Sequence, residues 1–91
     1  MQINDYQLHA SLTIGKHDED FFLRKLSTEV VEVAKELAFI VREKPNEALI
    51  LELGDVIRNV AQIATLNKIK MSDLLEANIM KMDERSKNSQ L

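Results

Sequence analysis

Two pairs of carboxylates, each with a three-residue spacing, are the side chains in this sequence best placed to do chemistry. Glu29 and Glu32 form the first pair, and Glu52 and Asp55 form the second. The second pair lies inside the otherwise apolar segment ALILELGDVIRNVA, residues 48–61. Residues three or four apart share one face of a helix, so each pair predicts two acids side by side, and like charges at this spacing repel each other.

A bound divalent cation would remove this repulsion. If the two helices pack antiparallel, their acidic edges meet at the margin of the core, where desolvation and repulsion both disfavour ionised carboxylates. Ligand sets made only of oxygen select hard metals, which makes Mg²⁺ the first candidate and Mn²⁺ the second. The alternative interpretation is a helix surface on which each acid is paired with a Lys or Arg.

The elements that must position these acids are predicted to be helices, because the sequence has only two Gly and one Pro and is rich in residues that favour helix. Asn4 and Gln7 form a capping-box pattern that predicts the start of a first helix, and Gly15 is expected to end it in the left-handed conformation. We therefore expect an all-α fold of four helices.

The later helices are bounded by recognisable signals. The second is predicted over residues 20–43, because Pro45 disfavours helix at the residue before it. The third is predicted over residues 46–67, and the fourth begins after Ser72, a good N-cap. The length fits a single domain over residues 1–85, followed by a frayed polar tail over residues 86–91.

Apolar residues recur at helical spacing in the second and third helices and predict two stripes that face the core. These residues are Leu26, Val30, Val33, Leu37 and Ile40 in the second helix, and Leu49, Leu53, Val56, Val60 and Ile63 in the third. A polar edge runs beside each stripe and carries Glu29, Glu32 and Glu36 in the second helix, and Glu52, Asp55, Asn59 and Gln62 in the third. The acids are thereby separated from the bases.

Composition and charge exclude several classes of protein. The net charge of −3 and the scattered Lys and Arg residues leave no basic patch for nucleic acid. The sequence has no cysteine, no signal-peptide pattern at residues 1–10 and no apolar run long enough to span a membrane. We expect a protein of the cytoplasm with neither a membrane nor a nucleic acid as partner.

Three segments resemble, in order, the MazG-type family of all-α nucleoside triphosphate pyrophosphohydrolases. They are STEVVEV at residues 27–33, LELGDV at 51–56 and EANIMKMDER at 76–85. The family shares an ExxE pair, a later ExxD pair on a facing helix and an NxxK motif. The opening INDYQLHASLT, residues 3–13, is also similar to the family's first helix.

The resemblance implies that Glu29, Glu32, Glu52 and Asp55 hold Mg²⁺, which binds the triphosphate and helps to activate water. The reaction would convert a (d)NTP to a (d)NMP and pyrophosphate, with removal of non-standard nucleotides as a role. Metal-assisted positioning of charge suits this reaction. An acid of either pair could accept the proton of the attacking water.

The resemblance also implies residues that contact the nucleotide. Asn78 and Lys81 match the NxxK positions, with Lys81 expected on phosphate, and Arg85 lies one turn further along. A solvated helix face is the alternative for Arg85. Asn59 lies one turn beyond Asp55, where it could hydrogen-bond a base or ribose, or equally a neighbouring carboxylate.

The apolar stripes are too wide for one short chain to cover. We therefore expect a homodimer, or a dimer of dimers, in which helices from two chains complete a bundle around each site. The alternative to the enzyme is a non-catalytic helical dimerisation or interaction module on the same scaffold.

Overall fold

The computed structural model describes residues 1–38 and 47–87, apart from the side chains of Glu36 and Ala38. It contains four helices, α1 (Ile3–Ser11), α2 (Glu19–Ala38), α3 (Glu47–Leu66) and α4 (Met71–Lys87), and no strand within the described ranges. The predicted all-α class is confirmed. The predicted extension of the second helix over residues 39–43, and the predicted start of the third at Asn46, lie outside the described residues.

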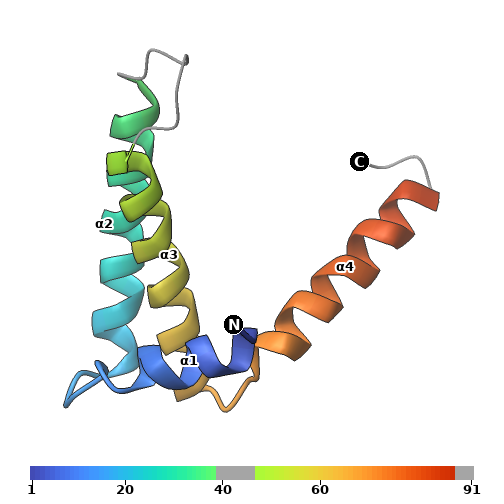
Figure 1. The fold of residues 1–91 in the computed structure, drawn as a ribbon, viewed down its shortest axis with the longest axis horizontal. Helices are drawn as coiled ribbons and strands as arrows, with labels where there is room; N and C mark the ends of the chain where they lie inside the picture. The colour runs from blue at the N-terminus through green and yellow to red at the C-terminus, as the bar shows by residue number, and fades with distance from the viewer. Residues whose placement is uncertain (39–46, 88–91) are drawn as a thin grey trace.

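The helices form an upright hairpin with a projecting arm (Figure 1). Helices α2 and α3 run antiparallel and pack side by side along their length, and α1 crosses the lower end of this hairpin. Helix α4 starts beside α1 and then leads away from the hairpin, so that most of its turns lie apart from α2 and α3. It ends at Lys87, two residues into the predicted tail, and residues 88–91 lie outside the described part.

The hairpin is fastened at its lower end. The backbone N–H of Phe21 donates to Asp18 Oδ1 at 3.0 Å, which makes Asp18 the N-cap of α2. Glu19 and Asp20 follow in the first turn, where negative charge is favourable. Asn67 Nδ2 donates to Glu19 Oε1 at 3.2 Å and ties the end of α3 to the start of α2.

A Schellman motif ends α3 and turns the chain toward α4. The N–H of Ile69 donates to the carbonyl of Ala64 at 2.8 Å, and that of Lys68 donates to the carbonyl of Thr65 at 3.0 Å. Lys68 takes the left-handed conformation with φ of 58° that this motif requires. Only four residues, 67–70, separate the end of α3 at Leu66 from the start of α4 at Met71, which makes the change of direction abrupt.

Two predicted caps are wrong in their position. Helix α1 begins at Ile3 with Gln2 as its N-cap and without a side-chain cap, so Asn4 and Gln7 form no capping box there. Ser72 is the second residue of α4, not its N-cap. Gly15 is left-handed as predicted, with φ of 62°, but it lies beyond the end of α1 at Ser11.

The fully buried apolar core is small. Ala10, Ala61, Ala64 and Met71 form one cluster where α1, α3 and the start of α4 meet, and Phe22 of α2 is also fully buried. The predicted core stripes are only partly covered, since Val30 is 52% exposed and Leu53 is 45% exposed. In α3 the polar edge is the better buried one, because Asn59 and Gln62 are 1% and 2% exposed. One chain therefore leaves much of its apolar surface uncovered.

Candidate metal centre

Three carboxylates converge between α2 and α3. Glu29 comes from the middle of α2, and Glu52 and Asp55 come from consecutive turns of α3. One oxygen of each lies within 4.8 Å of the others, and none of the three residues is fully exposed. Two mid-helix acid pairs on antiparallel neighbours therefore do meet as the sequence predicted, through three of their four members.

The donor set fits a hard divalent cation. Carboxylate oxygens are the ligands that Mg²⁺ and Mn²⁺ prefer. Magnesium commonly takes only a few carboxylates from a protein and completes its shell with water and substrate phosphate. Three acids from two neighbouring helices would thus leave part of the shell of such a metal open to other ligands.

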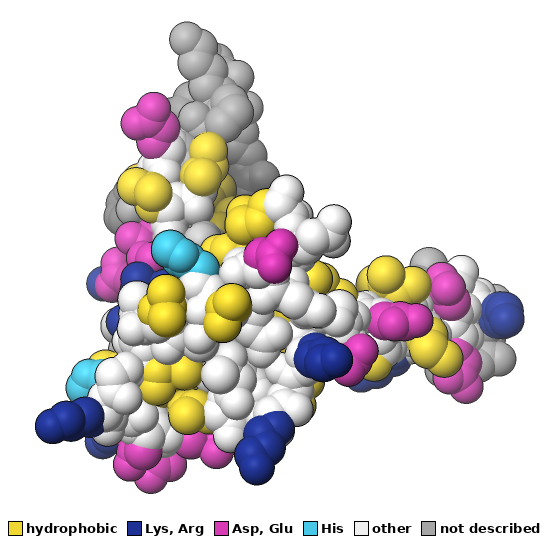
Figure 2. Space-filling model, turned by 60° about the horizontal axis from the view of Figure 1, so that its bottom comes forward, with side chains coloured by type: hydrophobic (Ala, Val, Ile, Leu, Met, Phe, Trp, Pro, Cys, Tyr) yellow, Lys and Arg dark blue, Asp and Glu magenta, His cyan; other side chains and the backbone are white. Residues whose placement is uncertain are grey.

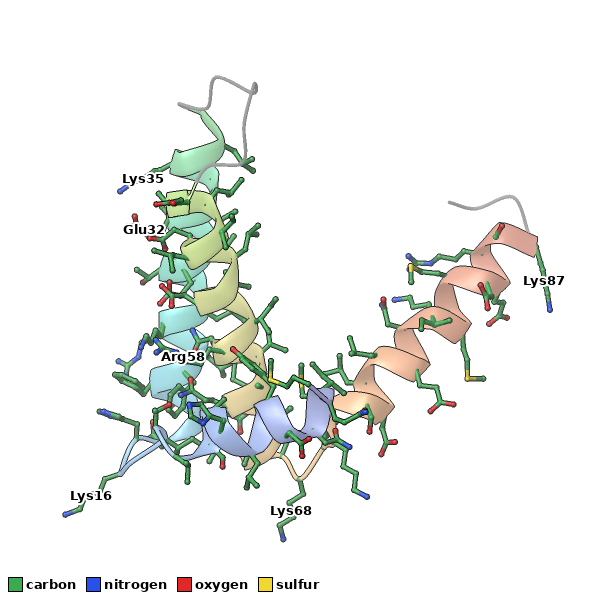
Figure 3. All side chains as sticks on the ribbon, in the orientation of Figure 1. Lys16, Glu32, Lys35, Arg58, Lys68 and Lys87 are labelled. Atoms are coloured by element: carbon green, nitrogen blue, oxygen red, sulfur yellow. The ribbon has the colours of Figure 1, made fainter. Side chains whose placement is uncertain are left out.

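Glu32, the fourth predicted ligand, is not in this group of three. Its Oε1 lies 3.6 Å from Nζ of Lys35, one turn further along α2, and its side chain is 42% exposed (Figure 3). An exposed pair of this kind is worth about 0–1 kcal/mol, so it offers little resistance to a change of partner. Glu32 remains a predicted ligand that would have to leave Lys35 to reach the metal.

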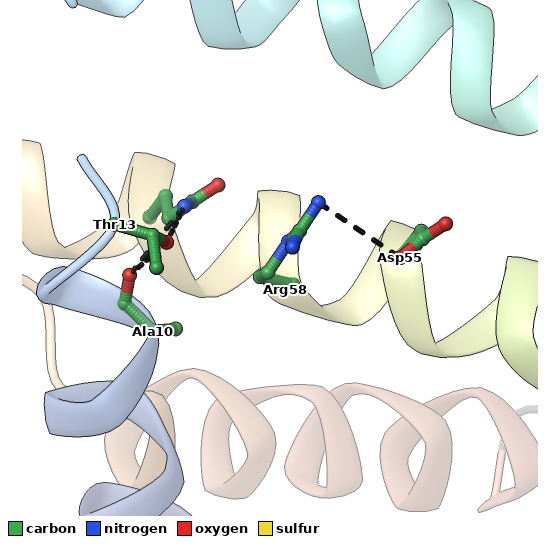
Figure 4. A network of polar contacts seen from close by, with 5 residues as sticks. Ala10, Thr13, Asp55 and Arg58 are labelled. Atoms are coloured by element: carbon green, nitrogen blue, oxygen red, sulfur yellow. Dashed lines mark hydrogen bonds and ion pairs between the residues drawn. The ribbon is translucent and has the colours of Figure 1, made fainter. Parts of the chain in front are cut away.

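Arg58 brings a positive charge to the group of three. Its Nη2 lies 3.9 Å from Asp55 Oδ1, and the two side chains are 39% and 42% exposed (Figure 4). At this distance and exposure the pair contributes about 0–1 kcal/mol and does not prevent Asp55 from binding a cation. Arg58 was not among the residues predicted to be functional, although its three-residue spacing from Asp55 was the signal for it.

Asn59 and Gln62 are two buried polar residues of α3 that follow Asp55 toward the end of the helix. Gln62 Nε2 donates to Thr13 Oγ1 at 2.7 Å and to the carbonyl of Ala10 at 3.4 Å, which docks α3 on the end of α1 (Figure 4). Neither amide atom of Asn59, nor Gln62 Oε1, has a hydrogen-bond partner within the part of the chain that the structure describes. Buried polar groups are nearly always paired, so Asn59 is a costly residue at this position.

Replacement of Asn59 by Leu, which has a similar volume, is expected to raise the melting temperature. Removing an unpaired buried amide is worth about 1–3 kcal/mol, which corresponds to roughly 4–8 °C per kcal/mol in a domain of this size. Thermal unfolding followed by circular dichroism measures the change. A melting temperature that falls would contradict this account, because it would mean that the amide is satisfied in solution.

The predicted nucleotide contacts on α4 are not brought to the carboxylates of the same chain. Asn78, Lys81 and Arg85 are all exposed. They lie on the part of α4 that projects away from the hairpin (Figure 1). A single chain therefore carries the two halves of the predicted site on separate arms.

These features define a class: an all-α protein with an oxygen-only candidate cation site between two antiparallel helices. Residues 19–90 match the model of the MazG nucleotide pyrophosphohydrolase domain, and the chain belongs to this family. The predicted family is thus confirmed. No curated protein and no solved structure shows significant similarity to the chain.

The family match begins at the first residue of α2. Helix α1, where the sequence also resembled the family, lies outside the matched range. The match includes both acid pairs and the NxxK positions of α4. None of the helices within the described residues has both the length and the apolar character needed to cross a membrane.

Proposed function

We propose that this protein is a Mg²⁺-dependent nucleotide pyrophosphohydrolase that converts a (d)NTP to a (d)NMP and pyrophosphate. The observation that carries the proposal is the convergence of Glu29, Glu52 and Asp55 in a chain of this family. Mn²⁺ would serve in place of Mg²⁺, because both accept carboxylate and phosphate oxygens. Removal of non-standard nucleotides in the cytoplasm is the role that fits this activity.

The chemistry is displacement at the α-phosphorus by water. The water oxygen bonds to the α-phosphorus, the bond from this phosphorus to the bridging oxygen breaks, and pyrophosphate leaves. A bound magnesium ion would neutralise phosphate oxygens and orient the attacking water. The carboxylates would hold the ion, and one of them would accept the proton of the water. Arg58, beside Asp55, adds positive charge where the phosphates would lie.

A homodimer would complete the molecule. Exposed apolar residues lie along both arms, and Figure 2 shows such side chains on the hairpin and on the projecting helix. They include Ile50, Leu53 and Ile57 of α3, and Leu75, Ile79 and Met82 of α4. Apolar surface of this kind is what a dimer interface covers.

In such a dimer, or dimer of dimers, α4 of one copy would pack against the hairpin of the other. The hairpin and α4 each carry an apolar stripe, so the stripe on α4 of one copy can cover the stripe on the hairpin of a second copy, and the reverse. This arrangement would bring Asn78, Lys81 and Arg85 to the carboxylates of the partner. The phosphates of the nucleotide would then lie between two copies. One copy would contribute the carboxylates with their metal, and the other would contribute Lys81 and Arg85.

The test is a panel of canonical and modified (d)NTPs with Mg²⁺ or Mn²⁺, with release of pyrophosphate as the readout. We expect pyrophosphate and the monophosphate as the products, and no activity with a chelator present. Release of inorganic phosphate in place of pyrophosphate would contradict the proposed reaction.

The second candidate is a non-catalytic interaction module on the same scaffold. The exposed apolar stripes favour it, because they would bind a second copy whether or not the protein is an enzyme. Dimerisation without release of pyrophosphate from any nucleotide of the panel would select this candidate.

A further inference from the structure

Two side chains of α1 cap the N-terminus of α4, a helix that starts more than sixty positions later in the chain. Asn4 Oδ1 accepts the backbone N–H of Ser72 at 3.1 Å. Gln7 Oε1 accepts the backbone N–H of Met71 at 2.8 Å. The first N–H groups of any helix lack partners within it, so α1 supplies to α4 what a local N-cap side chain usually supplies.

The same two amides also donate. Asn4 Nδ2 donates to Ser72 Oγ at 3.0 Å. Gln7 Nε2 donates to the carbonyl of Ile69 at 2.7 Å and to Thr65 Oγ1 at 3.2 Å. Gln7 therefore contacts the last turn of α3, the connector and the first residue of α4 at once. Amides bonded at both ends leave the start of α4 little freedom to rotate.

An apolar contact supports these hydrogen bonds from below. Met71 is 3% exposed and packs with Ala10, Ala61 and Ala64. Ile3, Tyr6, Val60 and Leu74 pack around this cluster. We call Asn4, Gln7 and Met71 the α1 bracket. Beyond it, α4 projects away from the hairpin (Figure 1).

Small changes at the bracket are amplified along α4. Lys81 lies ten residues beyond Met71, which is about 15 Å along a helix. A change of about 10° in the direction of α4 would therefore move Lys81 by roughly 2.6 Å. Misplacement of a substrate-positioning group by about 1 Å is enough to lower a rate substantially.

We propose that Asn4 and Gln7 are positioning residues that fix the direction of α4 and thereby place Asn78 and Lys81 for the nucleotide. Helix α1 lies outside the residues 19–90 that match the family. The part that concerns the nucleotide rests on the proposed function. The part that concerns the direction of α4 does not, and it is tested separately.

The direction of α4 is measured by pulsed electron paramagnetic resonance. The chain has no cysteine, so Ser27→Cys on α2 and Glu84→Cys on α4, both exposed positions, provide a clean pair of labelling sites. Labelled chains are diluted into an excess of unlabelled chains, so that only distances within one chain are recorded. In Asn4→Leu and Gln7→Leu we expect the distance distribution to broaden or shift. An unchanged distribution would overturn the proposal.

Two further variants separate capping from general damage. Asn4→Asp and Gln7→Glu keep the oxygens that accept the N–H groups of α4 but lose the donors, and a negative charge at a helix N-terminus is favourable. We expect the Asp and Glu variants to retain most of the native distance distribution, even where the Leu variants lose it or fail to fold. His9→Ala, an exposed position on the same helix, is the control. An Asp or Glu variant that is folded and as broad as its Leu counterpart would overturn the capping role.

The consequence for the nucleotide is measured in the active enzyme. In Asn4→Leu and Gln7→Leu we expect KM for the nucleotide to rise about three- to tenfold while Mn²⁺ affinity, measured by its own resonance signal, stays unchanged. A broadened distribution with an unchanged KM would overturn the link to the nucleotide. Absence of activity in the parent chain would refute the proposed function and leave the distance test intact.

Discussion

Glu29→Gln and Asp55→Asn are each expected to lower kcat/KM for release of pyrophosphate by about 100- to 1,000-fold. Each change removes one negative charge and one strong metal ligand from the group of three carboxylates but keeps the size of the side chain. Initial rates over a range of Mg²⁺ concentrations give the loss, and part of it should be recovered at high Mg²⁺. Circular dichroism establishes that the helices are intact.

Two controls give this result its meaning. Glu76→Gln removes an exposed acid of α4 that also has an acid three residues before it, and we expect activity within about twofold of the parent. Glu32→Gln tests whether Glu32, which lies beside Lys35, is also a metal ligand. A loss as large as that of Glu29→Gln would mean that all four predicted acids hold the metal. Glu29→Gln and Asp55→Asn with full activity would refute the metal centre.

Ile57→Glu is expected to dissociate the homodimer and to lower activity by about 100-fold or more. Ile57 is 48% exposed in the single chain and lies on the side of α3 that also exposes Ile50 and Leu53. A charge buried there without a partner would cost several kcal/mol of association, and each 1.4 kcal/mol is a factor of ten in affinity. Sedimentation at micromolar concentration measures the mass, and circular dichroism shows whether the fold is kept.

Ser27→Glu, on an exposed polar position of α2, is the matched control and should remain a dimer with full activity. Subunit mixing tests whether sites are shared between copies. If Lys81 acts on the carboxylates of a partner, mixing inactive Glu52→Gln and Lys81→Ala chains should restore up to about a quarter of the parent activity, because a mixed dimer has one intact site. No recovery would place both residues in one chain, and a monomeric parent protein would refute the dimer.

The sequence alone determined that the chain forms four helices, and it predicted the start of α2 and the end of α3 to within one residue. The main signal is local, because apolar residues at helical spacing act over one or two turns. The same locality placed Glu52 beside Asp55 on one face of α3. The motifs from which the family was predicted are also short stretches of sequence, and the match over residues 19–90 confirmed that family.

Only the tertiary structure decided which faces meet. Sequence spacing treated Glu29 and Glu32 alike, yet the packing of α2 on α3 brings Glu29 to the group of three and leaves Glu32 beside Lys35. It also buries Asn59 on an edge that the pattern assigned to the polar side. A helix has several faces, and which one is buried depends on neighbours that are distant in the sequence.

The caps of α4 show the same division. An Asn and a Gln three residues apart near a helix start are a local signal, and the pattern predicted a cap for α1. In the folded chain Asn4 and Gln7 instead satisfy the N–H groups of Ser72 and Met71, because the Schellman motif after α3 brings the start of α4 against α1. The sequence supplies the two amide side chains, but their hydrogen-bond partners lie more than sixty residues away and are brought to them only by the tertiary fold.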